Sequence, residues 1–433
     1  MNGPSVSERA GRTRTPLTRD QIVGFWAAWA GWTLDGMDSV IYALVLAPAL
    51  TELLPRSGVT PTAAHVGMYG SILFALFLLG WGLSAVWGPV ADRFGRSRVL
   101  AFTVLVYAVF TGIAALSQSV WQLALFRLLT GIGIGGEWAL AGTYVAEAWP
   151  EDRRKMGAGY LQTGYYAGFF LAAALNYTIG ARFGWRAMFF CGAVPVALAI
   201  AILARVKEPE RWRRTDGPAR THRRPIVEIF DAAHRRRTVV NAALVAVAII
   251  GLWAAAVYEP TAVIALARKA GMDPHDATRM ASFATGVLSI GTILGCLALP
   301  PLAGRFGRRP VLAGYFFGMG VTIAVGFGVI FYSQNALAPF VAMLFVLGFF
   351  GGSFTMFSLW LPEQYATRVR ATAFAFTTSA GRFVGAGVNF LLAWFVAKTG
   401  TLGLPVACTS IAFFLGILVL PFALETRGKP LPE

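Results

Sequence analysis

Apolar residues run through this chain in long, nearly uncharged stretches that short polar segments separate. An α-helix needs about 20 mostly apolar residues to cross a bilayer. Twelve stretches reach that length, and they run near 22–50, 66–88, 99–117, 120–148, 156–179, 186–205, 239–266, 278–302, 310–332, 335–362, 370–396 and 402–424. The pattern therefore predicts an all-α integral membrane protein with twelve transmembrane helices.

One long polar gap, rich in Arg and Pro, divides these helices into two sets of six. The domain organisation that follows is a tail, a first six-helix bundle, a linker, a second six-helix bundle and a final tail. We expect these parts at 1–21, 22–205, 206–238, 239–424 and 425–433.

Composition agrees with a membrane protein, and the distribution of charge gives its orientation. The 433 residues are 56% hydrophobic and 13% charged, with a formal net charge of +16. Most of the 37 Lys and Arg residues lie in the two tails and in alternate loops on the same side as the tails. Positive loops stay in the cytoplasm, so we expect both termini there and the protein in the cell inner membrane. Topology explains the charge, and a nucleic-acid partner is not needed.

Two loop motifs occur in both halves of the chain. GPVADRFGRSRVL (88–100) matches PLAGRFGRRPVL (301–312), and VAEAWPEDRR (145–154) matches LPEQYATRVR (361–370). The second pair aligns the two glutamates, Glu147 with Glu363, and the two arginines, Arg154 with Arg370. Repeats at corresponding loops indicate duplication of a six-helix unit, and hence two pseudo-symmetric bundles.

The motifs resemble those of a known transporter family. GPVADRFGRSR resembles the loop signature of the major facilitator superfamily, and RLLTGIGIGGEW (127–138) resembles its signature in the fourth helix. KEPERW (207–212) and LETRGKPLPE (424–433) resemble segments of sugar-porter-like members. The combination of LDGMD, GGEWALAGTYVAEAWPEDRR, GYLQTGYYAGFF and GWRAMFFCGAVPVALAI is most similar to the sialate:proton symporter family, followed by metabolite:proton and aromatic-acid:proton symporters.

This resemblance implies two bundles that rock around a central cavity and expose a midplane site to each side in turn. It implies a proton as coupling ion and no cofactor. Glycine supports the close helix packing of such a fold, because 48 glycines are present and Gly131 and Gly135 stand at small-xxx-small spacing.

Two carboxylates, Asp35 and Asp38, interrupt the first apolar stretch, and Arg127 lies in the fourth. Each charge costs roughly 2.5–3.5 kcal/mol at a bilayer centre. At 1.5 Å per residue, Asp38 and Arg127 reach a comparable depth from opposite directions, so we expect them to pair.

By resemblance to proton-coupled sugar porters, the Asp38–Arg127 pair implies a protonation switch; a static ion pair is the alternative. Asp35 is either a second proton carrier or a hydrogen-bond acceptor for helix ends. Glu137, after two glycines on the fourth helix, either relays protons and gates or packs at the cytoplasmic interface.

Arg382, deep in the eleventh helix, has no acid on its own helix. Guanidinium binds a carboxylate bidentately, so Arg382 is a candidate anchor for an anionic substrate. Pairing with an acid on another helix, such as Glu259, is the competing explanation. Polar and aromatic residues of the helices are further candidates for lining the cavity: Gln162, Tyr165, Tyr166, Asn389 and Trp360.

Charged residues crowd the repeated loops. The resemblance implies that such loops hold the bundles together on the cytoplasmic side, while simple positive-inside anchoring is the alternative. The gate candidates are Asp92, Arg96, Glu147, Arg153, Glu363 and Arg370, with Glu259 before Pro260 as an outer gate. Gly304 replaces the aspartate that would match Asp92, which predicts an asymmetric latch.

These features together predict a secondary active transporter that takes up a small organic anion (a monocarboxylate, sialic acid or an aromatic acid) with protons. We expect a monomer in the lipid bilayer. A sugar symporter and a proton-driven exporter are rivals; the helix 5 Gly-Pro signature usual in exporters is missing, and Arg382 argues against a neutral sugar. No Ser/His/Asp set, metal spacing or phosphate loop is visible, so we expect neither an enzyme nor a metal site.

Overall fold

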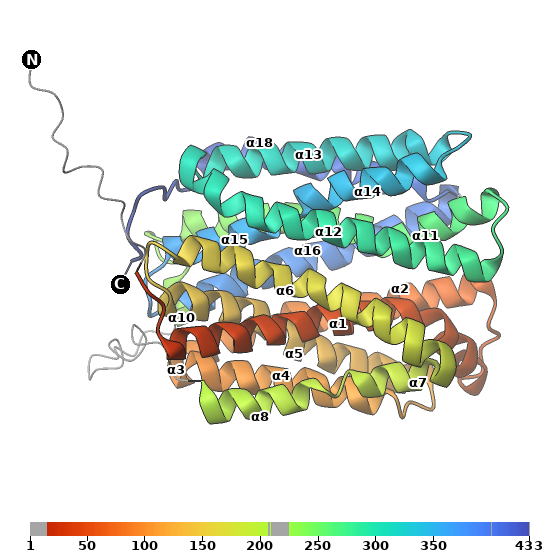
Figure 1. Ribbon diagram of the computed structural model, residues 1–433, viewed down its shortest axis with the longest axis horizontal. Helices are drawn as coiled ribbons and strands as arrows, with labels where there is room; N and C mark the ends of the chain where they lie inside the picture. The colour runs from red at the N-terminus through yellow and green to blue at the C-terminus, as the bar shows by residue number, and fades with distance from the viewer. Residues whose placement is uncertain (1–14, 207, 209–224, 400, 433) are drawn as a thin grey trace, which may run out of the picture.

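The computed structural model describes residues 15–206, 208, 225–399 and 401–432. Every regular element in these ranges is helical, as predicted. The long helices run side by side along one axis (Figure 1). Helix α1 begins at the same end at which the chain ends. We call this the proximal end, and the opposite one the distal end.

The first six predicted spans are present in the first half of the chain. The second span contains a short 3-10 helix, the fifth ends in a π-helix, and a short turn at 192–194 interrupts the sixth. The elements are α1 (Arg19–Arg56), α2 (Ala63–Leu83), η2 (Ser84–Val86), α3 (Trp87–Phe94), α4 (Arg96–Ala114), α5 (Val120–Ala148), α6 (Arg154–Leu175), η3 (Asn176–Gly180), α7 (Ala181–Cys191) and α8 (Pro195–Arg205).

The second half repeats this arrangement after a short helix, α10 (Pro225–Glu228), that lies within the predicted linker. The remaining elements are α11 (Arg235–Lys269), α12 (Pro274–Phe306), α13 (Arg308–Gly328), η4 (Ile330–Tyr332), α14 (Leu337–Gly351), α15 (Phe354–Trp360), η5 (Pro362–Gln364), α16 (Arg370–Thr399), α17 (Gly403–Cys408), α18 (Ser410–Val419) and η6 (Leu420–Phe422).

Within the described ranges, 9 helices are long and apolar enough to cross a membrane, or 10 if the bent α1 is counted. The other two predicted spans correspond to α6 and α11, which run the length of the bundle beside the rest (Figure 1). These two helices carry candidate site residues, among them Gln162 on α6 and Glu259 on α11.

Backbone contacts at glycines hold the helices of each half together. A Cβ on Gly131 of α5 would lie 2.2 Å from the Phe77 carbonyl oxygen of α2, and one on Gly80 would lie 2.0 Å from that of Leu128. The second half has the same reciprocal contact between α12 and α14, at Gly291 and Gly348. Such close approach supplies the dispersion contacts that drive helix association in lipid.

A sharp turn at a glycine precedes the third helix of each half. Gly95 and Gly307 adopt φ values of 110° and 98°, which favour glycine. The helix that follows is capped by a distant glutamate: Glu208 accepts from the Arg96 amide at 2.7 Å, and Glu425 from the Arg308 amide at 3.0 Å. Burial alone would raise the pKa of Glu425. The hydrogen bonds from the amides of Arg308 and Arg309 outweigh that effect and lower the pKa.

The two halves meet along two helix pairs. Helix α16 of the second half packs along α2, and α12 packs along α6. Helices α1 and α5 lie behind these pairs, packed on α6 and α2. The buried charges predicted from the sequence lie on α1, α5 and α16, and therefore next to the boundary between the halves.

Replacing Gly131 with Ala tests the close α2–α5 contact. The new methyl group must push the α2 backbone away, which we expect to cost about 1–3 kcal/mol of unfolding free energy. Gly314→Ala is the matched control, because no atom lies within 4 Å of a Cβ there and alanine favours the helix. Thermal unfolding in detergent measures both. Equal melting temperatures for the two variants would contradict the contact.

Candidate functional site

Asp38 of α1 and Arg127 of α5 form the ion pair that the sequence predicts. Their Oδ2 and Nη1 atoms lie 3.6 Å apart, and neither side chain has any exposed surface. Among the described residues, no hydrogen bond satisfies the carboxylate oxygens or the guanidinium nitrogens. The pair is thus long and loosely held, unlike the bidentate pairs at the proximal end.

Aromatic rings complete the surroundings of Arg127. Its guanidinium carbon lies 5.1 Å from the Tyr42 ring centroid and 4.7 Å from that of Phe189. Cation–π contact with two rings stabilises a buried guanidinium even without its carboxylate. Arg127 can therefore lose Asp38 as a partner without losing all stabilisation.

A second group of carboxylates lies one turn nearer the proximal end. A Cβ on Gly31 would lie 1.8 Å from Glu137 Oε1, so Glu137 of α5 rests directly on α1 one turn before Asp35. Both Asp35 and Glu137 are fully buried, and in the described part of the chain their oxygens have no hydrogen-bond partner. Asp35 interacts electrostatically with Glu137, Asp38 and Arg382.

Arg382 of α16 brings a cation from the second half to these carboxylates. Its guanidinium carbon lies 4.3 Å from the Trp81 ring centroid and 5.4 Å from that of Trp138. Only 2% of the residue is exposed, and Nη1 has no hydrogen-bond partner among the described residues. Its electrostatic neighbours are Tyr165 and Asp35. The alternative pairing with Glu259 is not present in the described ranges.

Trp138 connects the two halves at this point. Its indole nitrogen donates to Ser358 Oγ of α15 at 2.8 Å and to Gln162 Oε1 of α6 at 3.2 Å. Ser358 also donates to Gln162 at 3.3 Å. Phe354 and Phe374 of the second half pack on the Trp138 ring. Gln162, a predicted site residue, thus lies at the boundary between the halves.

A stack of aromatic rings lies beside this network. The Tyr165 and Trp32 centroids are 4.6 Å apart, and Trp32 lies almost parallel to Trp138 at 6.0 Å. The Tyr165 hydroxyl is buried without a hydrogen-bond partner in the described structure. Tyr166 packs edge-on against Tyr165. These buried rings continue from Trp138, whose ring contacts the Arg382 guanidinium.

The remaining predicted residues lie apart from this cluster. Asn389 donates to Gly385 of its own helix at 2.9 Å. Glu259 accepts a hydrogen bond from Thr285 of α12 at 3.0 Å. The indole of Trp360 donates to the Leu424 carbonyl, just after the last helix, at 2.9 Å.

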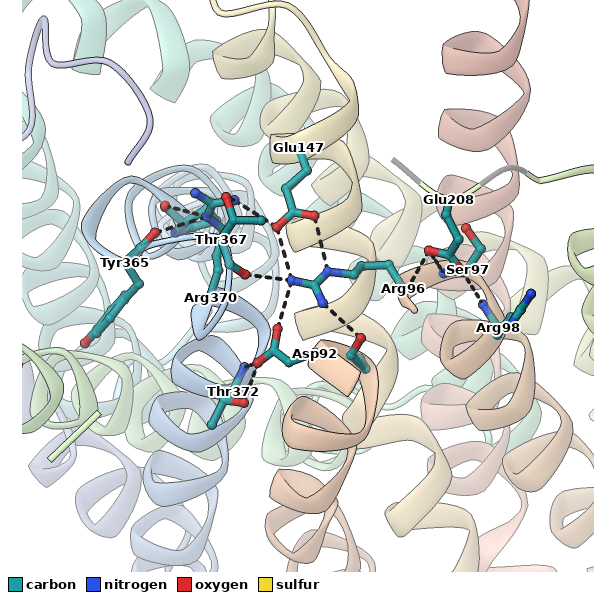
Figure 2. Close-up of polar contacts among 12 residues, drawn as sticks. Asp92, Arg96, Ser97, Arg98, Glu147, Glu208, Tyr365, Thr367, Arg370 and Thr372 are labelled. Atoms are coloured by element: carbon teal, nitrogen blue, oxygen red, sulfur yellow. Dashed lines mark hydrogen bonds and ion pairs between the residues drawn. The ribbon is translucent and has the colours of Figure 1, made fainter. Parts of the chain in front are cut away.

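Charged side chains of both halves interlock at the proximal end (Figure 2). Arg96 contacts Glu147 at 3.2 Å and Asp92 at 2.8 Å within the first half. Across the boundary, Glu147 binds Arg370 Nη1 at 2.8 Å, and Asp92 accepts from the Thr372 amide at 2.9 Å. Asp92, Arg96, Glu147 and Arg370, which we call the latch, thus join the two bundles at the proximal end.

The second half carries a related cluster around Glu363. Arg308 binds Glu363 through two nitrogens, at 2.6 and 2.9 Å, and Arg154 of the first half lies 3.6 Å away. Gly304 is the counterpart of Asp92 in the repeat, and no atom lies within 4 Å of the place where a Cβ would stand. The latch is therefore asymmetric, as the sequence predicts.

The gate candidate Arg153 differs in its surroundings from the residue that follows it. It lies partly exposed at the start of α6, whereas its neighbour Arg154 reaches the other half. Sequence reasoning also left out Arg308 and Thr372. The signal for Arg154 and Arg308 was present in the repeat, because they match Arg370 and Arg96. Trp81 and Trp138 carry no such signal, because a buried tryptophan in a helix reads as ordinary packing.

The described residues hold no group of three or more His, Cys, Asp or Glu side chains suited to a metal ion. The central cluster consists of carboxylates, guanidinium groups and aromatic rings. Carboxylates can take up and release protons, and guanidinium groups and aromatic rings can bind organic ions.

Removing one or both partners of the Asp38–Arg127 pair tests its strength. Arg127→Gln leaves a buried carboxylate alone and should cost about 3–5 kcal/mol of unfolding free energy. The double variant with Asp38→Asn should cost clearly less than the sum of the single changes. Denaturant titration in mixed micelles measures this cycle. Additive effects would show that the two groups do not interact.

Comparison with known proteins agrees with this architecture. The chain is 27% identical over 417 residues to the "Probable 4-methylmuconolactone transporter" of Cupriavidus pinatubonensis, covering 93% of this chain and 90% of the relative. The 4-hydroxybenzoate transporter PcaK of Acinetobacter baylyi is 26% identical, with 93% of each chain covered. The sialic acid transporter NanX of Escherichia coli is 29% identical over 44% of this chain and 45% of its own.

Among solved structures, the proton:xylose symporter XylE bound to 6-bromo-6-deoxy-D-glucose has the same fold. The TM-score is 0.76 at 20% identity, covering 95% of this chain and 97% of that one. The family model of the Major Facilitator Superfamily matches residues 28–388. The chain is therefore a multi-pass membrane transporter, not an enzyme, and it belongs to the Major Facilitator Superfamily.

Proposed function

We propose that this transporter takes up a small, flat organic carboxylate together with protons. The observation that carries the proposal is Arg382, whose buried guanidinium keeps one nitrogen without a hydrogen-bond partner among the described residues. A buried charged donor is costly to leave unsatisfied. A carboxylate offers the bidentate partner that such a group lacks.

The rings around Arg382 favour a flat substrate. Trp81 and Trp138 flank the guanidinium, and Tyr165 and Trp32 continue the aromatic surface. Offset stacking on such faces contributes about 0.5–1.5 kcal/mol beyond burial. The relatives named for 4-hydroxybenzoate and 4-methylmuconolactone support the same substrate class, since both molecules carry rings.

Proton coupling follows from the carboxylates next to Arg382. An ionised Asp35 competes with an incoming anion for the guanidinium and repels it. A proton on Asp35 or Glu137 removes that repulsion. Proton binding therefore strengthens anion binding at Arg382, and anion binding strengthens proton binding by the same factor. Protonation of Asp38 would likewise release Arg127, which its two aromatic rings still stabilise.

The proximal end is the cytoplasmic side in this proposal, because the positively charged loops between the described helices, the start of α1 and the C-terminal segment lie there. The latch of Asp92, Arg96, Glu147 and Arg370 then holds the transporter closed toward the cytoplasm. Substrate release inside the cell requires these pairs to separate, as in other rocking transporters. The inner membrane is the expected location.

A proton-coupled sugar symporter is the second candidate. This candidate is supported by Glu208 and Glu425, which cap the first amides of α4 and α13. Both glutamates lie in segments that resemble those of sugar porters. A neutral sugar offers no charge to Arg382, so binding of an organic acid decides between the two. A thermal-shift screen with lactate, sialic acid, aromatic acids, dicarboxylates and hexoses makes that comparison.

Arg382→Lys tests the substrate anchor. Lysine keeps the charge but loses the bidentate geometry, so affinity for the carboxylate should fall at least about tenfold, or about 1.4 kcal/mol. Isothermal titration with the best acid from the screen measures the dissociation constant. Arg305→Lys, at an exposed proximal position, is the matched control. Unchanged affinity in Arg382→Lys would remove this residue from the site.

Asp38→Asn tests proton coupling. The neutral side chain mimics the protonated state permanently, so uptake against a gradient should be lost while substrate exchange across the membrane continues. Proteoliposomes with an imposed pH gradient measure both, and a protonophore should abolish uptake by the parent protein. Asp276→Asn, at an exposed position, serves as the control. Full accumulation by Asp38→Asn would contradict this assignment.

A further inference from the structure

The segment Glu425–Pro432, after the last helix, does not leave the protein. It crosses the proximal end, and 4% of Leu431 is exposed. Like the latch residues, this segment contacts both bundles. We call it the crossing segment.

Glu425 and Thr426 bind the second half, and after them three further hydrogen bonds hold the crossing segment to the two halves. From the first half, Arg154 donates to the Lys429 carbonyl at 3.4 Å, and Glu151 accepts from the Leu431 amide at 3.0 Å. From the second half, Arg370 donates to the Pro432 carbonyl at 2.5 Å. The two arginines occupy equivalent positions in the repeat, so the segment is bound by the same residue from each half.

Leu431 lines a small hollow together with residues of both halves. Gly142, Ala146 and Ala158 belong to the first half, and Ser358 and Leu359 belong to the second. The buried Leu431 side chain forms the wall of this hollow on the side of the crossing segment. Neither half alone provides this hollow.

The hollow also lies next to the central cluster. Ser358 lines it and at the same time accepts the Trp138 indole bond and donates to Gln162. The crossing segment therefore covers the proximal side of the residues that link the two halves at the proposed substrate site.

We propose that the crossing segment is a tethered ligand of the proximally closed state, and that it blocks the path from the central site to the proximal side. The inference rests on the alternating access proposed above, although not on the identity of the substrate. A group that binds only one of two states stabilises that state by its binding free energy. Because the site exists only while the halves are together, the segment must leave before the proximal end opens.

The tether makes this binding efficient. Arg309 donates to the Ala423 carbonyl, and Glu425 caps α13, so the chain is fixed where the segment begins. A short tether raises the effective concentration of Leu431 at its hollow. Few contacts then suffice to shift the balance between the closed and open states.

Labelling of a cysteine at position 358 tests the inference. The three native cysteines are replaced, Ser358→Cys is introduced, and an impermeant maleimide is applied from the proximal side in oriented vesicles. Leu431→Ala removes the burial of the leucine and should speed labelling roughly 5- to 30-fold. Glu151→Ala removes the anchor of the Leu431 amide and should speed it less.

Two controls make the outcome decisive. Leu418→Ala is the same change at a side chain that is 68% exposed, and it should leave the labelling rate unchanged. Asp92→Ala breaks the latch without touching the segment and should speed labelling. If Asp92→Ala speeds labelling and neither Leu431→Ala nor Glu151→Ala does, the crossing segment is not a barrier. If Asp92→Ala has no effect either, the proposed opening at the latch fails as well.

Discussion

The structure depends on one constraint, the cost of burying charge where water cannot solvate it. Inside a bilayer-spanning bundle each ionised group needs a partner, aromatic faces or a proton. At the proximal end this need is met between the halves, by Glu147 with Arg370 and by Asp92 with the amide of Thr372. In the centre it is met only in part, because Asp35, Glu137 and one nitrogen of Arg382 have no hydrogen-bond partner in the described structure. The well-satisfied charges hold a state, and the poorly satisfied ones are available to a proton and a substrate.

Much of the fold could be predicted from the sequence because lipid imposes simple rules. The length of the apolar stretches predicted the helices, and the loop repeat predicted the two halves. The depth of Asp38 and Arg127 on their helices predicted the ion pair that the structure contains. Each of these signals is local in the chain or depends only on a rise of 1.5 Å per residue. Glycine spacing similarly indicated close helix packing at Gly131, and the structure shows that the helix it contacts is α2.

The rest could not be predicted, because it depends on which helices face each other. Arg382 could be identified as a lone buried cation, but its neighbours Trp81 and Trp138 lie on other helices. Trp360 has the same composition signal as Trp138 but faces Leu424 instead. Arg153 and Arg154 are adjacent, and only the start of α6 decides which one reaches Glu363. The crossing segment has no helical pattern at all, so only its contacts reveal where it lies.

The central claim is that buried charges change partners as the two halves rock. Distances between paired spin labels test it most directly, with one pair at the exposed proximal positions 93 and 305 and another at the exposed distal positions 118 and 334. The account predicts two populations for each pair. Lowering the pH or adding a transported acid should shift them in opposite directions, one end opening as the other closes. A single distance at each end that never changes with protons or substrate would contradict it.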